Sequence, residues 1–170
     1  MKQSFGISVV VITLLAQRPA DAALKETTPS TVCKFLNARG LITGSWKDYG
    51  PGGSSAGNFG CHSPYQELGT RSSLRNNLAY YVEGQPAKAG LLYLVLNVND
   101  RSQAVLAHKA LLEAAELLAQ KATGRALPDN IRQAITLGSK ASAPSAGSLI
   151  RVIRIDWPTG RGYEIKVFFE

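Results

Sequence analysis

The residues of this chain that could do chemistry are few, and the densest group is Cys61-His62-Ser63. A cysteine or serine beside a histidine can act as a nucleophile with its base, provided that the two side chains come within hydrogen-bonding distance. Residues 58–62 have the pattern of a short strand, however, and neighbouring residues in a strand point to opposite faces. Cys61 and His62 should therefore not meet, and we expect no catalytic residue. A small envelope hydrolase that uses His62 with a nearby serine or cysteine is the alternative.

Cys61 has one other cysteine to pair with, Cys33, because the chain contains 2 cysteines. In an exported protein such a pair most simply forms a disulfide. The bond would close a loop of about 28 residues and would contribute roughly 3–4 kcal/mol in the chain-entropy model. A zinc site fits less well, because His62 is next to Cys61 and no second ligand pair follows at the usual spacing. We expect no metal and no cofactor.

The second histidine, His108, lies on the apolar side of a helix that the sequence predicts over 100–124. A core-facing position in the middle of a helix gives no route to a substrate, so a structural role is the better interpretation. Glu113 and Glu116 lie three residues apart on the same helix, and Lys109 is nearby. A solvated, charged helix face explains this pair of carboxylates without a catalytic role.

Basic and aromatic residues offer another candidate chemistry, a surface that stacks rings and attracts anions. The residues that we expect to contribute to such a binding surface are Trp46, Tyr49, His62, Arg151, Arg154 and Arg161. Arg151 and Arg154 should point to opposite faces of one strand. The competing interpretation assigns the aromatic residues to the core and the arginines to solubility. The scattering of the basic residues along the chain favours that second interpretation.

The first 22 residues have the pattern of a secretory signal peptide. Lys2 precedes an apolar run over 5–15, and Ala20-Asp21-Ala22 is a small-residue cleavage pattern. We expect cleavage after Ala22 and a periplasmic or secreted mature protein; an uncleaved membrane anchor is the alternative. The apolar run is shorter than a bilayer requires, and no later run reaches that length. We therefore expect no stable membrane insertion.

The mature chain, residues 23–170, has the length of one domain with its own core. Its longest element is the helix over 100–124, which Asp100 and Gln103 should cap and Gly124 should end. An apolar stripe broad enough to face a core follows the helix. The residues of that stripe are Val105, Leu111, Leu112, Ala115, Leu118 and Ala119.

The other expected elements complete an α+β pattern. Thr28 and Pro29 are typical of a helix start, and shorter helices are expected over 28–40 and 128–138. Strands are expected over 43–49, 58–62, 78–83, 91–98, 150–157 and 163–169. The segments 50–57, 63–77 and 140–147 have the composition of connections. This order predicts an antiparallel sheet of about six strands packed against a long central helix and two shorter helices.

The formal net charge is +7 and becomes +6 when residues 1–22 are removed, because that segment carries Lys2, Arg18 and Asp21. A positive charge favours acidic partners, but the scattered basic residues do not indicate nucleic acid. Without a convergent set of titratable groups, the compact frame is typical of a binding module. We expect an exported, non-catalytic binding or adaptor protein of the bacterial envelope that docks a macromolecular partner, an acidic protein. An immunity or inhibitor protein that blocks an envelope enzyme is a further alternative.

Overall fold

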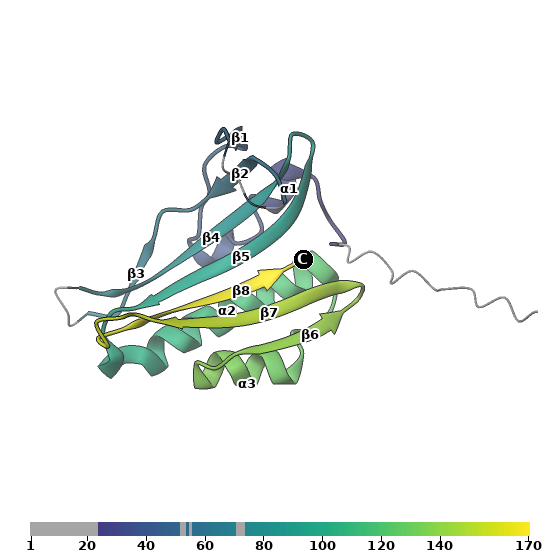
Figure 1. Ribbon diagram of the computed structural model, residues 1–170. Coiled ribbons are helices and arrows are strands. Elements are labelled where there is room, and N and C mark those ends of the chain that lie inside the picture. Colours follow the sequence, from purple (N-terminus) through teal and green to yellow (C-terminus); the bar gives the residue numbers. More distant parts are fainter. Residues whose placement is uncertain (1–23, 52–53, 55, 71–73) are drawn as a thin grey trace, which may run out of the picture.

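The computed structural model describes residues 24–51, 54, 56–70 and 74–170 (Figure 1). The signal peptide predicted for residues 1–22 and its cleavage point lie outside this range. Among the described residues, no helix combines the length and the apolar character that a membrane crossing needs.

The described residues form an antiparallel sheet of eight strands with helices packed on it, which confirms the α+β prediction. The strands are β1 (Lys47–Asp48), β2 (Phe59–His62), β3 (Gln66–Leu68), β4 (Asn76–Gln85), β5 (Lys88–Val98), β6 (Ala141–Ser145), β7 (Ser148–Asp156) and β8 (Tyr163–Phe169). Their spatial order is β1-β2-β4-β5-β8-β7-β6, and β3 pairs with β4 next to β2. The apolar strand β5 lies in the middle of this order, as its nearly unbroken hydrophobic run requires.

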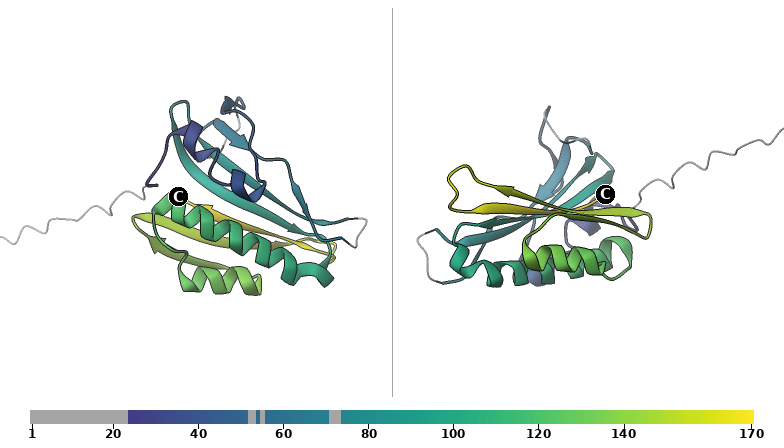
Figure 2. Two further views of the ribbon diagram at one scale, coloured as in Figure 1. Left: turned by 180° about the vertical axis from the view of Figure 1, so that it is seen from behind. Right: turned by 60° about the horizontal axis from the view of Figure 1, so that its bottom comes forward.

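The helices of the described chain gather on one side of this sheet (Figures 1 and 2). They are α1 (Pro29–Val32), α2 (Ala104–Thr123) and α3 (Asp129–Leu137), with the 3-10 turns η1 (Asn37–Arg39) and η2 (Arg101–Gln103). The right-hand view of Figure 2 shows the sheet from its edge, with α2 and α3 on the same side of it. Contacts of α3 with β6 and β7, and of α2 with β5, hold the two layers together.

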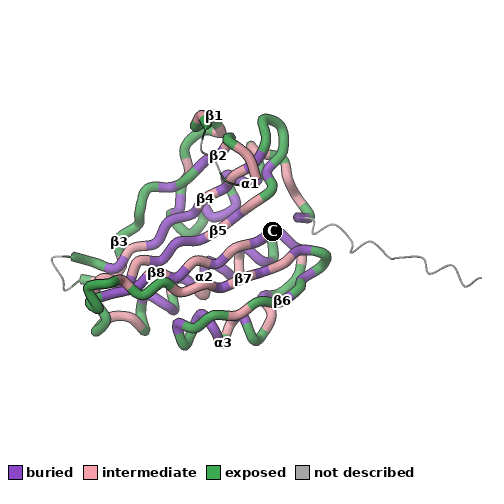
Figure 3. The backbone as a smooth tube through the Cα atoms, in the orientation of Figure 1, coloured by how far each residue is buried: buried purple, intermediate pink, exposed green. Residues whose placement is uncertain are grey.

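Alternation along the strands assigns the side chains to two faces. The face toward the helices, called the covered face, includes Leu78, Tyr80, Val82, Leu92, Leu94, Leu96, Ile165, Val167 and Phe169, all of them buried. The opposite face, called the open face, includes His62, Tyr81, Glu83, Tyr93, Arg151, Glu164, Lys166 and Phe168, which are half-buried or exposed. The same alternation of buried and less buried positions is visible along β8 in Figure 3. The sheet therefore has one side inside the core and one side toward solvent.

The long helix begins and ends close to the expected residues. The Asp100 carboxylate accepts a hydrogen bond from the Ser102 N–H at 2.9 Å, and the Gln103 side chain donates to the same carboxylate at 3.3 Å. Gly124 ends α2 with φ of 70°, a left-handed conformation that glycine adopts without a steric penalty. Val105 was expected in the apolar stripe, and that prediction is wrong, because 85% of its surface is exposed. A seven-residue repeat drifts by about 20° per heptad around a straight helix, so the first turn carries Val105 away from the core.

The segment 140–147 was expected to be a linker and is instead an edge strand with its turn. β6 pairs with β7 from Ala141 to Ser145, and a two-residue turn at Ala146 and Gly147 joins them. Both turn residues have positive φ, 51° and 86°, as the tight turns of β-hairpins require. Pro144 removes a backbone donor and is tolerated because β6 is the last strand of the sheet.

Three segments of the N-terminal part differ from what the sequence predicts. The helix expected over 28–40 is limited to α1 and the turn η1, and Gly40 follows with φ of 76°. Only Lys47 and Asp48 of the strand expected over 43–49 pair with β2. The connection expected over 63–77 contains β3 and the first residues of β4. For the two segments that concern strands, pairing with a neighbouring strand, which local sequence does not encode, decided the outcome.

Candidate binding face

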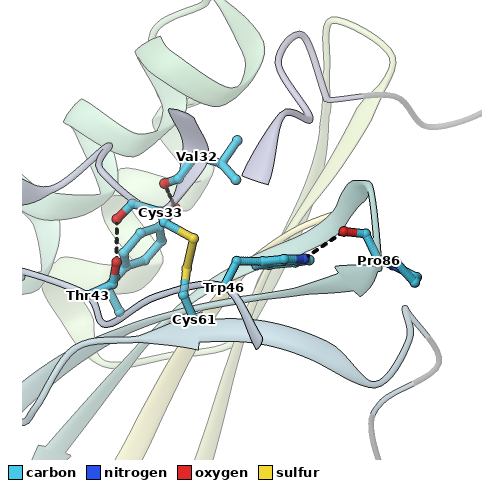
Figure 4. Close-up of a disulfide and its surroundings, with 7 residues drawn as sticks. Val32, Cys33, Thr43, Trp46, Cys61 and Pro86 are labelled. Carbon is cyan, nitrogen blue, oxygen red and sulfur yellow. Dashed lines mark hydrogen bonds between the residues drawn. A yellow bond between two sulfur atoms is a disulfide. The ribbon is translucent and has the colours of Figure 1, made fainter. Parts of the chain in front are cut away.

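The predicted disulfide is present and joins α1 to the sheet (Figure 4). Cys33 follows α1 directly and Cys61 lies in β2, with their Cα atoms 6.1 Å apart and both side chains buried. Two hydrogen bonds surround the bond: the Tyr80 hydroxyl donates to the Val32 carbonyl at 2.9 Å, and the Thr43 hydroxyl donates to the Cys33 carbonyl at 2.8 Å. The sulfur of Cys61 is therefore committed to a structural bond on the covered face.

His62 lies on the opposite face from Cys61, as the strand alternation predicted. Its Nδ1 is 3.2 Å from the Ser63 carbonyl oxygen, which can only accept, so Nδ1 is the donor of this contact. The Ser63 hydroxyl is buried and accepts a hydrogen bond from the Tyr80 N–H at 3.0 Å. Neither the Cys61–His62 pair nor the Ser63–His62 pair is thus assembled as a nucleophile with its base.

A continuous line of rings crosses the open face, because four cross-strand pairs place it in register. His62 is opposite Tyr81, Tyr81 is opposite Tyr93, Tyr93 is opposite Phe168, and Phe168 is opposite Arg151. Successive ring centres are 5.4, 4.9 and 5.4 Å apart from His62 to Phe168. The Arg151 guanidinium lies 5.1 Å from the Phe168 ring centre. These five residues, from β2 to β7, are called the aromatic row.

Two further tyrosines extend the aromatic row. The Tyr49 ring lies 5.9 Å from His62 and is 48% exposed, and Lys47 Nζ is 5.0 Å from its centre. Gly60 allows this approach, because a Cβ at that position would lie 3.3 Å from the Tyr49 ring. Burial first, and then a hydrogen bond to Tyr65, raises the pKa of Tyr81 above its ordinary value. Tyr81 is therefore a neutral phenol at physiological pH.

A pocket of about 310 Å³ opens beside the aromatic row. Residues that line it include Tyr49, Phe59, His62, Tyr81, Glu83 and Tyr93. The Tyr93 hydroxyl donates to Glu83 Oε1 at 2.6 Å, whereas Glu83 Oε2 is buried and has no hydrogen-bond partner. Burial, followed by the bond to Glu83, raises the pKa of Tyr93 above its ordinary value, so that its hydroxyl remains a donor. The pocket thus combines apolar rings with a carboxylate that has spare acceptor capacity.

Of the six residues predicted for a binding surface, three lie on the open face together. Tyr49, His62 and Arg151 belong to the aromatic row or its extension. Trp46 lies 6.5 Å from the Phe59 ring but donates to the Pro86 carbonyl at 3.0 Å, and it lines a separate groove next to Cys33. Figure 4 shows Trp46 pointing away from the disulfide toward Pro86.

Arg154 and Arg161 lie away from the aromatic row. Arg154 is on the covered side of β7, where its guanidinium is 3.7 Å from the Tyr163 ring centre and donates to the Gly138 carbonyl. Arg151 and Arg154 therefore occupy opposite faces, as predicted. Arg161 is exposed in the turn between β7 and β8, where its N–H donates to the Thr159 hydroxyl at 3.4 Å. The six residues do not form one surface.

Sequence reasoning missed Tyr81, Tyr93 and Phe168, which form the centre of the aromatic row, and Glu83, which supplies the carboxylate of the pocket. Each was noted only as part of a strand, because alternation separates two faces but does not say which face the helices cover. Cross-strand register, which brings Tyr81 and Tyr93 opposite each other, is a tertiary property. The nearest signal in the sequence was the odd-numbered aromatic or polar positions along β4 and β5.

His108 has the structural role that was predicted for it. It is 7% exposed, and its Nδ1 donates to the Thr136 carbonyl at 3.0 Å. Its Nε2 and the Tyr163 hydroxyl are hydrogen-bonded at 2.8 Å. Both ring nitrogens are occupied, and the ring ties α2 to the end of α3 and to β8.

No cluster of three or more histidine, cysteine or acidic side chains suited to a metal ion occurs in the part of the chain that the structure covers. Comparisons with protein-family models, curated protein sequences and solved structures found no match to this chain. The fold and the site themselves therefore define the class: a disulfide-linked α+β protein with an aromatic face on its sheet.

Proposed function

We propose that this protein is an exported, non-catalytic binding protein of the bacterial envelope that docks a macromolecular partner on the open face of its sheet. The observation that carries the proposal is the aromatic row, which crosses five strands without a helix above it in the described structure. A binding role needs such a surface and needs no reacting group.

The composition of the open face suits protein recognition. Tyrosine, other aromatic residues and arginine are enriched where protein interfaces gain most of their binding energy. Here the rings of Tyr81, Tyr93 and Phe168 form the apolar centre, and Arg151 lies at one end in an ion pair with Glu170. Lys166 and Glu164 pair at 3.1 Å beside them and supply a polar rim.

Two observations support export. Disulfides form and persist in oxidising compartments and are rare in the cytosol. The Cys33–Cys61 bond holds α1 against the sheet, and a bond of this kind supports an oxidising compartment. The signal-peptide pattern of residues 1–22 agrees with this interpretation.

Site-specific photo-cross-linking tests the proposed function. A photoreactive phenylalanine analogue at Phe168 would report contacts of the open face, and the same analogue at Val105 would report contacts of the helix side. Val105 is a matched control because it is apolar and 85% exposed on α2. We expect a stoichiometric adduct in envelope extract from position 168 and none from position 105.

The identity of the adduct then separates the remaining candidates. A recovered envelope enzyme whose activity falls on binding would support the inhibitor version of the proposal. An adduct that forms equally well from both positions, or none from position 168, would contradict docking on the open face.

A further inference from the structure

The pocket beside the aromatic row is lined by one carboxylate and by no basic side chain among the described residues. Glu83 is the only ionisable carboxylate among the described residues that line it, and that lining contains no lysine or arginine. The chain as a whole carries 19 basic residues against 12 acidic ones. The pocket is thus a negative site within a positive molecule.

One carboxylate oxygen of Glu83 lacks a hydrogen-bond partner. Its Oε1 accepts from Tyr93, while Oε2 is buried without a partner. A buried carboxylate oxygen without a donor costs free energy, and a cation that donates a hydrogen bond removes that cost. Because Glu83 lines the pocket, rotation of its terminal carboxylate presents this oxygen to a donor seated there.

The ring geometry narrows the kind of cation. Tyr81 and Tyr93 are nearly parallel, with 5° between their planes, and their ring centres are 4.9 Å apart. The two rings therefore stack on each other, and their π faces are not free to attract a cation. What these rings offer a ligand in the pocket is apolar contact. Selection must come from a hydrogen bond to the carboxylate, which a primary ammonium can make and a quaternary ammonium cannot.

From this geometry we infer that the pocket binds a primary ammonium group carried on an alkyl stem, with Glu83 as its counter-ion and the tyrosine rings around its stem. The inference rests on the proposed function, because it specifies the chemistry of the ligand at the same face. The ammonium belongs either to a lysine side chain of a docked protein or to a free small amine, and both share this chemistry. A pocket of about 310 Å³ is at the small end of ligand sites and suits such a group.

A titration of the disulfide-intact protein tests the inference. The probes are n-butylammonium chloride and tetramethylammonium chloride at constant ionic strength, followed by NMR shifts of the Tyr93 and Glu83 signals. We expect saturable shifts with n-butylammonium and about tenfold weaker binding, or none, with tetramethylammonium. Equal binding of the two probes, or no saturable shift with either, would overturn the inference and leave Oε2 to be satisfied by water.

Two variants locate the charge responsible. Glu83→Gln keeps the shape and an oxygen for Tyr93 but removes the charge, and should weaken n-butylammonium binding about tenfold. Glu170→Gln is the matched control, because Glu170 also lies at this face but is already paired with Arg151. Unchanged binding by Glu83→Gln, or the same loss in both variants, would contradict the inference. The selectivity of the wild-type protein decides the matter if Glu83→Gln does not fold.

The cross-linking experiment also distinguishes the two sources of the ammonium group, a lysine side chain of a docked protein and a free small amine. If a lysine side chain fills the pocket, acetylation of lysines in the extract should abolish the adduct from position 168, and excess n-butylammonium should compete with it. If the adduct survives both treatments while n-butylammonium still binds the purified protein, the natural ligand is a free amine. Absence of the adduct from untreated extract, with n-butylammonium selectivity intact, would contradict the proposed function alone. Loss of n-butylammonium selectivity, with the adduct intact, would contradict the assignment of the pocket alone.

Discussion

The two faces of the sheet come from the same strands and differ in what their side chains do. On the covered face, Leu92, Leu94 and Leu96 are completely buried against α2 and the core. On the open face, Tyr93 contacts Tyr81 and Phe168 across the strands and keeps part of its surface toward solvent. Stability should therefore depend mainly on the covered face, whereas the open face is available for recognition.

Replacement of a covered-face side chain should have the largest effect. We expect Leu94→Ala to lower the free energy of unfolding by about 2–5 kcal/mol, because a fully buried leucine leaves a cavity. Phe168→Ala, on the open face of the neighbouring strand, should cost about 1 kcal/mol from lost ring contacts. Urea denaturation of both variants measures the difference, and equal losses would mean that the open face also belongs to the core.

Removal of the disulfide should have the second-largest effect on the free energy of unfolding. We expect the double variant Cys33→Ser/Cys61→Ser to lose roughly 3–4 kcal/mol, because the bond closes a loop of about 28 residues. Cys61 is among the residues that line the pocket, but it pairs with Val82 on the covered face. Because the cross-strand pairs of the aromatic row do not involve α1, n-butylammonium binding should persist in the folded variant. Urea denaturation and the same NMR titration measure the two effects; binding lost together with the bond would show that α1 shapes the pocket.

Alkaline pH should show that tyrosines of both faces resist ionisation. Burial raises the pKa of Tyr80 on the covered face and of Tyr81 and Tyr93 on the open face from the ordinary value of 10.0. A raised pKa in the folded state means that the folded protein holds the proton more tightly. The resulting stabilisation is fully present below about pH 10 and is lost as the pH rises toward the folded pKa values.

Phenolate absorbance and near-ultraviolet circular dichroism, followed together during titration with base, check this expectation. We expect the phenolates of these three residues to appear only as the tertiary signal is lost. In a Tyr93→Phe variant one fewer phenolate should appear in that late step. Complete ionisation while the tertiary signal is intact would contradict the burial of all three hydroxyls.

The smallest effect should come from the exposed start of α2. Val105→Ser should change the free energy of unfolding by no more than about 0.5 kcal/mol, because surface substitutions away from specific contacts are close to neutral. Urea denaturation measures it against Leu111→Ala, whose side chain on the same helix is completely buried. A large loss at Val105 would indicate that this residue is covered in the protein as it exists in solution.

Elements with strong local patterns were predictable. The alternation of Tyr163, Ile165, Val167 and Phe169 with Glu164 and Lys166 predicted β8, and Asp100 and Gly124 predicted the ends of the α2 region. The Cys33–Cys61 bond followed from there being no other cysteines to choose. These features depend on neighbouring residues in the chain or on residue counts, so the sequence alone is enough to predict them.

Elements that depend on pairing with another strand were not predictable. β6 consists of small residues and a proline, and it is a strand only because β7 offers an edge to pair with. The candidate site also depends on strand pairing. Tyr49 and His62 could be named from the sequence, but the strand pairs that place them beside Tyr81, Tyr93 and Glu83 could not. Register between strands is set by packing over the whole sheet and by turn geometry.

The amino-acid sequence alone determined that this chain forms an α+β structure with a long amphipathic helix, a terminal hairpin and one disulfide. Hydrophobic periodicity, helix-end residues and cysteine number are local quantities, and local quantities can be read along a chain. Only the tertiary structure decided which side of each strand the helices cover. That choice left His62, Tyr81, Tyr93, Phe168 and Arg151 side by side on the open face, because burying the aliphatic side chains of the same strands turned these residues toward solvent.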